Sequence, residues 1–111
     1  KKGICLGFVI CLRENTNYQS INYKFFQKRH NKFLYIDRIA IASKYQSSGI
    51  GSILYNKLLS IKAKFNIPIC AEVNIDPPNE LSINFHRKHG FSDITESTIK
   101  EGYSVVYMEV S

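Results

Sequence analysis

Residues 46–51 read Gln-Ser-Ser-Gly-Ile-Gly and connect an apolar, β-branched stretch to an amphipathic one. The stretch before them, residues 33–42, has the composition of a buried strand. In residues 50–65 the apolar side chains recur about every 3.6 positions, which predicts a helix that Asn66 and Pro68 end. The first turn of a helix carries unpaired N–H groups and a partial positive charge. Two glycines at such a turn let a phosphate approach these groups, so the sequence predicts a phosphate or pyrophosphate site.

Other phosphate-binding turns do not fit residues 46–51. A P-loop places Lys followed by Ser or Thr after its second glycine, whereas this chain has Ser52 and Ile53 there. A Rossmann turn has a third glycine and an acidic residue about 20 positions later, and neither is in place. One alternative stays open, in which Gly49 and Gly51 only allow close packing between the helix and the strand.

The remaining strands are predicted from apolar, partly β-branched runs. These runs lie at residues 4–12, 69–75, 91–94 and 103–110, with a loop through residues 101–102 before the last one. Together with the helices, they predict one mixed α/β domain over the whole chain of 111 residues.

A second, shorter helix is predicted to begin after Asn79, which is a favourable N-cap, and to run to His89. Gly90 is suited to the left-handed conformation that ends a helix. Residues 13–32 are polar and aromatic without a clean period. A connection of this length predicts either a functional loop or a short helix.

The composition excludes several classes of protein. Hydrophobic residues make up 44% of the chain and charged residues 22%, which indicates a packed core rather than disorder. The apolar run at residues 4–12 is too short to cross a bilayer, and no cleavage site follows it. Three cysteines without metal-binding spacing indicate buried, reduced thiols. We therefore expect a cytoplasmic protein with no membrane partner and no metal site.

The formal net charge of +6 suggests nucleic-acid binding at first sight. The lysines are scattered, however, and no dense basic run alternates with aromatic residues. A small anionic ligand or simple solubility explains the charge as well, so nucleic acid is an unlikely partner.

Two motifs together resemble the GNAT superfamily of N-acetyltransferases. Gln46-x-x-Gly49-x-Gly51, after a strand and before a helix, is similar to the family's acetyl-CoA signature. A later motif of the family is matched in order by Asn79, Ser82, Phe85, His86, Gly90 and Phe91. The sequence around Tyr35-Ile36-Asp37-Arg38 and Glu72-Val73-Asn74 also resembles a subgroup of bacterial GNAT proteins.

The resemblance implies a mostly antiparallel mixed sheet flanked by helices, and an acetyl-CoA-binding domain over residues 1–111. The family usually has a first strand and two helices before the strand that begins here near Ile4, and we expect the chain to lack them. Without that cover, the strand at residues 4–12 exposes apolar surface and an unpaired edge, which predicts poor solubility or a homodimer.

The resemblance also implies the chemistry. An acetyl group moves from acetyl-CoA to an amine by direct attack, and the acceptor is either a small molecule or a protein. The pyrophosphate is expected on the turn and the pantetheine along the preceding strand. The expected acetyl-CoA-binding residues are Ile39, Ala40, Ile41, Gln46, Ser47, Ser48, Gly49, Ile50, Gly51, Ser52, Asn79, Ser82 and Phe85.

Two residues are candidates for proton transfer. His86 stands where the family commonly has tyrosine, and an imidazolium there can protonate the departing thiolate. The alternative is a surface histidine in a basic segment. Asp37 is the first candidate for the base that deprotonates the amine, because an acid in an apolar strand is costly unless it is used or paired. Its alternative is an ion pair with Arg38 or Arg13, and Glu72 is the second candidate base.

Two rival functions remain. The first is a catalytically degenerate domain that binds acetyl-CoA without turnover, which the short N-terminus favours. The second is a basic, RNA-associated module whose binding is sensitive to salt.

Overall fold

The computed structural model describes residues 5–46 and 48–111. Within these residues five strands and three α-helices alternate along the chain. In order they are β1 (Gly7–Arg13), α1 (Ile21–Arg29), β2 (Leu34–Ile41), the 3₁₀ turn η1 (Ser43–Tyr45), α2 (Ile50–Phe65), β3 (Ile69–Asp76), α3 (Glu80–Lys88), β4 (Ser92–Lys100) and β5 (Tyr103–Val110).

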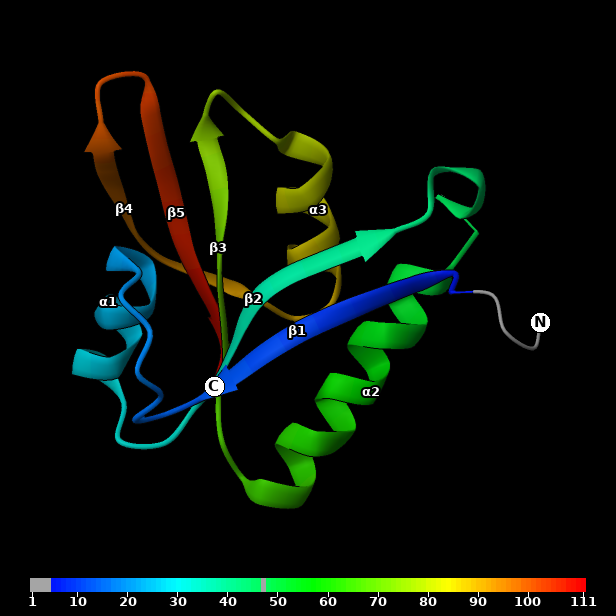
Figure 1. The fold of residues 1–111 in the computed structure, drawn as a ribbon, viewed down its shortest axis with the longest axis horizontal. Helices are drawn as coiled ribbons and strands as arrows, with labels where there is room; N and C mark the ends of the chain where they lie inside the picture. The colour runs from blue at the N-terminus through cyan, green and yellow to red at the C-terminus, as the bar shows by residue number, and fades with distance from the viewer. Residues whose placement is uncertain (1–4, 47) are drawn as a thin grey trace.

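The strands form one sheet in the order β1-β2-β3-β5-β4. Only β2 and β3 are parallel, and they pair at just two positions, Leu34 with Ile69 and Tyr35 with Cys70. Both strands continue for several residues past Tyr35 and Cys70, so they diverge from there (Figure 1). The mostly antiparallel mixed sheet expected from the sequence is confirmed.

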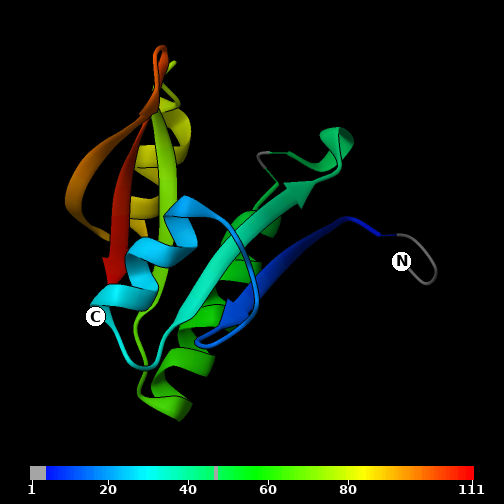
Figure 2. The ribbon, with the colours of Figure 1, turned by 60° about the vertical axis from the view of Figure 1, so that its left-hand side comes forward.

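Helices cover both faces of the sheet. In Figure 2, α1 lies in front of the sheet while α2 and α3 lie behind it. The core between the sheet and α2 contains Tyr55 and Leu58 of α2 together with Ile69 and Val73 of β3. On the opposite face a second, aromatic core forms under α1 from Tyr23, Phe26, Phe33, Tyr35, Cys70, Val105 and Tyr107.

A β-bulge interrupts β2 at Asp37. Ile10 of β1 pairs with Arg38 and Cys11 pairs with Ile36, so Asp37 has no opposite residue in the register. Such a bulge shifts the alternation of side chains by one position. In a regular strand Tyr35, Asp37 and Ile39 would share one face. Because of the bulge, Tyr35 packs under α1, whereas Ile39 packs against the α2 core.

The connection between β1 and β2 contains the helix α1. Ser20 caps it, because its Oγ accepts a hydrogen bond from the N–H of Tyr23 at 3.3 Å. Tyr23 and Phe26 are fully buried against the sheet. The sequence left this segment as a functional loop or a short helix, and the structure shows the helix. A helix of nine residues depends mainly on such tertiary packing.

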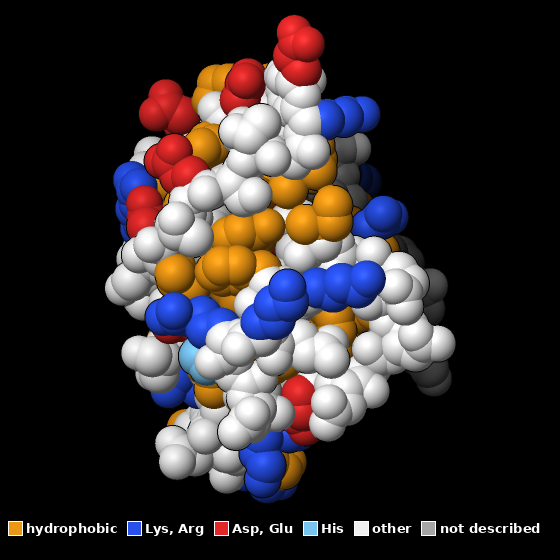
Figure 3. Space-filling model, turned by 90° about the vertical axis from the view of Figure 1, so that its left-hand side faces the viewer, with side chains coloured by type: hydrophobic (Ala, Val, Ile, Leu, Met, Phe, Trp, Pro, Cys, Tyr) orange, Lys and Arg blue, Asp and Glu red, His pale blue; other side chains and the backbone are white. Residues whose placement is uncertain are grey.

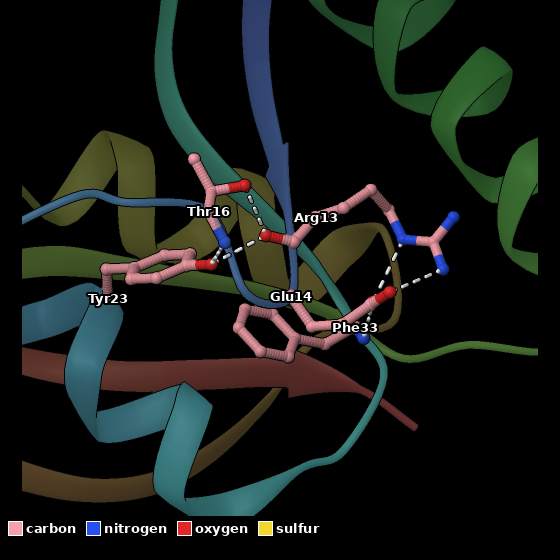
Figure 4. A network of polar contacts seen from close by, with 5 residues as sticks. All are labelled: Arg13, Glu14, Thr16, Tyr23 and Phe33. Atoms are coloured by element: carbon pink, nitrogen blue, oxygen red, sulfur yellow. Dashed lines mark hydrogen bonds and ion pairs between the residues drawn. The ribbon is translucent and has the colours of Figure 1, made fainter.

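Polar contacts hold the loop between β1 and α1 in place (Figure 4). The hydroxyl of Tyr23 donates to the carbonyl of Arg13 at 2.6 Å and accepts from the N–H of Thr16 at 3.0 Å. The carboxylate of Glu14 accepts from the N–H of Phe33 at 3.1 Å, which ties the loop to the start of β2. The loop is therefore fixed against both α1 and the sheet.

Most of the predicted element boundaries are confirmed. The helix at residues 50–65 has the predicted bounds, Asn79 caps α3, and Gly90 follows α3 with a φ of +93°. The fourth strand was predicted too short, since β4 extends to Lys100. No described helix is long and apolar enough to span a membrane.

The edge strand β1 carries exposed apolar side chains, as the sequence predicted. Phe8 and Ile10 are 43% and 45% exposed. The expectation of three buried thiols holds for Cys70 only: Cys11 is half-buried and Cys5 is exposed. Burial raises the pKa of the Cys11 thiol to about 11, so this side chain stays protonated near neutral pH.

Candidate functional site

A cavity of about 740 Å³ lies between the far end of β2 and the first turns of α2 and α3. Its size is typical of a site for a small molecule or cofactor. Most residues expected to bind the cofactor, together with His86, line this one cavity: Ile39, Ala40, Ile41, Gln46, Gly49, Gly51, Ser52, Asn79, Ser82, Phe85 and His86. Tyr45, Leu81 and Lys88 also line it.

The first turn of α2 faces this cavity without a side-chain cap. Gly49 occupies the N-cap position, and no side chain caps the helix there. The first intrahelical bond runs from the N–H of Ile53 to the carbonyl of Gly49, so the three preceding N–H groups remain free within the helix. By contrast, α3 is capped by Asn79, whose side chain accepts from the N–H of Ser82 at 3.2 Å. The unpaired donors of α2 make its N-terminus the favourable position for an anion.

The two glycines of the turn serve different purposes. Gly49 has a φ of +90°, and a Cβ added there meets no atom within 4 Å. Its backbone conformation is the one that side chains disfavour. A Cβ on Gly51 would lie 3.2 Å from the ring of Phe85, so this glycine lets α2 and α3 approach closely. The packing alternative considered from the sequence therefore applies to Gly51, which also lines the cavity.

Among the described residues, two that were expected to bind the cofactor, Ser48 and Ile50, do not line the cavity. Ser47 lies outside the described residues. The hydroxyl of Ser48 donates to the carbonyl of Tyr45, so it is used within the turn instead of facing a ligand. Ile50 is the first residue of α2, and its backbone N–H is one of the three that are free within the helix. Gln46 braces the turn, because its side-chain amide donates to the carbonyl of Ile41 at 3.3 Å.

His86 is buried between α3 and α2. Its Nδ1 donates to the carbonyl of Ser82 at 2.7 Å, which leaves Nε2 to accept from the hydroxyl of Tyr55 at 2.6 Å. Burial lowers the pKa of the His86 ring, so the neutral form is favoured. The surface alternative is wrong, since this side chain is only 5% exposed. The environment also weighs against the imidazolium acid expected from the sequence.

Two carboxylates stand on the α1 side of the sheet where β2 and β3 diverge. Asp37 lies two positions past Tyr35 and Glu72 lies two positions past Cys70, the last paired residues of the two strands. The hydroxyl of Tyr18 donates to Asp37 at 2.6 Å, and that of Tyr35 donates to Glu72 at 2.7 Å. Two tyrosines thus orient two acids on either side of the divergence.

The expected ion pair of Asp37 with Arg38 or Arg13 is not formed. Arg13 pairs with Glu14 at 3.0 Å instead. Within residues 5–46 and 48–111, neither Asp37 nor Glu72 has a cationic group within 4.0 Å.

Glu72 has the properties of a group that exchanges protons near neutral pH. Burial raises the pKa of its carboxyl to about 7, and the negative charge of Asp37 adds to the increase. The hydrogen bond from Tyr35 acts in the opposite direction. No residue-type pattern in the sequence distinguishes Glu72 in this way, because its burial and its partner Tyr35 come from the fold.

A third polar cluster anchors α1. Nε2 of His30 lies 2.6 Å from Glu109, and the guanidinium of Arg29 pairs with the same carboxylate at 3.0 Å. Cys70 is close enough to complete a set of three metal-ligating atoms. Burial raises the pKa of the Cys70 thiol, and Arg29 already neutralises Glu109. We therefore interpret this cluster as the tie between α1 and β5.

The comparisons with known proteins agree with this geometry. The model of the Acetyltransferase (GNAT) family matches residues 1–91. Arabidopsis thaliana Naa50 in complex with a bisubstrate analogue, CoA-Ac-MVNAL, is similar with a TM-score of 0.72 and 24% identity over 97% of this chain and 66% of that chain. No curated protein matches the chain significantly.

Two further structures share the fold. The ribosomal-protein-S18-alanine N-acetyltransferase from Escherichia coli gives a TM-score of 0.69 and 18% identity over 99% of this chain and 63% of that chain. The NatC complex bound to Gag peptide and CoA gives a TM-score of 0.73 and 15% identity over 99% of this chain and 63% of that chain. The chain thus spans less than two thirds of the length of these structures. Because the family model covers most of its residues, the chain belongs to the GNAT acetyltransferase family.

Proposed function

We propose that this chain transfers an acetyl group from acetyl-CoA to an amine by direct attack. The observation that carries the proposal is the cavity of about 740 Å³, where the free N–H groups of α2 meet the far end of β2 and the first turn of α3. Membership of the GNAT family supports the same reaction, as do the similar structures with CoA or a CoA conjugate.

Different walls of the cavity bind the pyrophosphate and the pantetheine of acetyl-CoA. The pyrophosphate binds the N–H groups at the start of α2, where the helix dipole also favours negative charge. The pantetheine lies along residues 39–41 of β2, whose backbone is free on the side where β3 has diverged. Lys88, which also lines the cavity, adds a positive charge for the phosphates. Ser47 is proposed to contribute as part of the same turn.

The proton leaves the acceptor on the α1 side. Glu72, with its pKa raised to about 7, accepts a proton from the ammonium group, while Asp37 holds that group in place. The free amine then attacks the thioester carbon, so the C–N bond forms and the C–S bond breaks. The amide nitrogen gives up its second proton, which passes through water to the departing CoA thiolate. Glu72 therefore replaces Asp37 as the proposed base.

His86 acts as a positioning residue in this proposal. Its two ring nitrogens connect the start of α3 to Tyr55 in the middle of α2. These two helices form opposite walls of the cavity, so the link keeps the phosphate-binding turn at a fixed distance from α3.

The test combines binding with turnover. The full chain is titrated with acetyl-CoA by calorimetry, and release of the CoA thiol is followed with a panel of amines, with mass spectrometry of the product. We expect one binding site and an N-acetylated product. Binding without turnover on any amine would support the catalytically degenerate alternative, and the absence of acetyl-CoA binding would contradict the proposed site.

A further inference from the structure

A second cavity, of about 600 Å³, lies on the other side of the molecule between α1 and the loop before it. Lys24 and Lys28 both line it, and both are exposed. They stand four residues apart on α1, so their side chains are neighbours on one helix face and repel each other. In the part of the chain that the structure describes, neither lysine forms an ion pair. This wall of the cavity therefore presents two unneutralised positive charges.

The remaining wall of this cavity is polar. Amide and hydroxyl side chains form it, namely Asn15, Thr16, Asn17, Gln19 and Gln27. Such groups both donate and accept hydrogen bonds. The cavity therefore suits a small polar molecule with an anionic group. Figure 3 shows the face of α1 and β4, where Lys and Arg side chains form a band across the middle and most Asp and Glu side chains gather toward the upper edge.

Tyr18 connects this cavity to the carboxylates at the centre of the sheet. Its side chain lines the cavity, and its hydroxyl donates to Oδ1 of Asp37 at 2.6 Å. Among the described residues, Oδ2 of Asp37 accepts no hydrogen bond, so it is available to a further donor. Tyr18 therefore lies between two groups of opposite charge. The two lysines line the cavity, and the carboxylates of Asp37 and Glu72 lie beyond the tyrosine hydroxyl.

The loop that carries Tyr18 is fixed in place. Tyr23, Thr16 and Glu14 bind it to α1 and to the start of β2, as Figure 4 shows. Tyr23 is itself fully buried in the aromatic core. The loop therefore gives the cavity a fixed polar wall, and a volume of about 600 Å³ suits a small acceptor.

We propose that the acceptor is a small amine that also carries an anionic group, as a free amino acid does. Its ammonium group binds Asp37 and Glu72 next to Tyr18, and its carboxylate binds Lys24 and Lys28. This inference rests on the proposed acetyl transfer and goes further by naming the class of acceptor. A peptide N-terminus lacks the carboxylate close to its amine.

The test compares matched acceptors on the full chain. Each amino acid is paired with its carboxamide, which keeps the amine and side chain but removes the negative charge, and with a dipeptide that begins with the same residue. We expect the free acid to have a value of kcat/KM at least about 10-fold above that of its carboxamide, since a charged hydrogen bond contributes on the order of 1.4 kcal/mol or more.

The lysines are tested on the same pairs. In the double variant Lys24→Gln, Lys28→Gln, KM for the free acid should rise about 10-fold while KM for the carboxamide and kcat stay unchanged. The control Lys57→Gln, Lys64→Gln removes the same charge from exposed positions on α2 and should change neither KM.

The outcomes separate the two proposals. Equal kcat/KM for acid and carboxamide, or a preference for the dipeptide, contradicts the inference and leaves acetyl transfer intact. No acetylation of any amine contradicts both. A rise in KM for the carboxamide equal to that for the acid shows that the lysines do not bind the carboxylate, and this also overturns the inference.

Discussion

The two faces of the sheet perform their proposed tasks with different parts of the chain. On the α2 side, the backbone provides the binding groups: the free N–H groups of a helix that has glycine at its N-cap, and the exposed edge of β2. On the α1 side, side chains provide them, and they come from positions far apart in the sequence, such as Tyr18 and Asp37. Backbone binding depends on local conformation, whereas side-chain binding depends on how the whole domain packs.

This difference indicates where each face is vulnerable. A single side chain added at the turn is expected to disturb the α2 side without unfolding the protein. On the α1 side, removal of one polar atom is expected to change the chemistry while acetyl-CoA still binds. If the two faces are separable in this way, a change on one face should leave the function of the other unchanged.

The largest effect is expected from Glu72→Gln. The amide cannot accept the ammonium proton, so kcat should fall by about 10²–10⁴-fold, while the Kd for acetyl-CoA stays unchanged. Steady-state kinetics and calorimetry on the same preparation measure both. The control Glu101→Gln changes an exposed residue in the turn between β4 and β5 and should retain activity. Wild-type kcat in Glu72→Gln would remove Glu72 from the mechanism.

The raised pKa of Glu72 also predicts the pH dependence of activity and of stability. Activity should rise as pH increases through about 7, because the base must be deprotonated. Since the folded protein holds this proton more tightly than the unfolded chain, the free energy of unfolding should decrease as pH rises from about 4.5 to about 7. Glu72→Gln should lack this decrease and be more stable than the wild type at pH 8, by about 1–3 kcal/mol. Urea unfolding of both proteins at several pH values measures these free energies of unfolding.

The next effect is expected from Gly49→Asp on the α2 side. The carboxylate would stand in open space at the phosphate position, so we expect acetyl-CoA to bind about 100-fold more weakly. Gly102→Asp is a matched control, because Gly102 also has a positive φ of +78° and open space around it, in the turn between β4 and β5. Equal loss of affinity in both variants would point to backbone strain, and no loss in either would contradict the phosphate site.

A smaller effect on function is expected from changes at the contact between His86 of α3 and Tyr55 of α2, on the side of the sheet away from the carboxylates. His86→Ala leaves the Tyr55 hydroxyl buried without its partner and should cost about 2–4 kcal/mol of stability. Tyr55→Phe should produce a similar but smaller loss. As a positioning residue, His86 should affect the Kd for acetyl-CoA and leave the shape of the kcat pH profile unchanged. Loss of one limb of that profile in His86→Ala would restore the acid role.

The α2 side of the sheet was more predictable from the sequence than the α1 side. The turn at residues 46–51, the helix after it and the Asn79 cap are local patterns, and the structure shows the helix and the cap as predicted. The role of His86 was harder to predict, because its environment depends on Tyr55, which lies 31 residues away. The same residue spacing that placed His86 beside the cofactor motif says nothing about which way its ring turns.

The α1 side was largely beyond prediction. The bulge at Asp37 shifts the alternation of β2, and no pattern in the strand sequence indicates it. Tyr35 and Glu72 lie 37 residues apart, so their hydrogen bond exists only once β2 and β3 pair. The sequence of α1 lacks a clean helical period, so it did not predict a helix with certainty. The helix is stabilised mainly by its packing on the aromatic core, which only the fold creates.

The smallest effect is expected from Tyr18→Phe. Loss of one hydrogen bond to Asp37 should raise KM for the amine about 3- to 10-fold, with no change in the Kd for acetyl-CoA. Tyr103→Phe serves as the control. An unchanged KM would mean that Tyr18 does not orient Asp37 for the acceptor.

The central claim is that acetyl-CoA binds through the backbone at the start of α2. Backbone amide NMR spectra of the uniformly ¹⁵N-labelled chain, recorded during titration with CoA, test it directly. We predict that the largest amide shifts occur in residues 49–52 and along residues 39–41, and that the amides of α1 shift least. Shifts concentrated on α1, or spread evenly over the chain with residues 49–52 unaffected, would contradict the account.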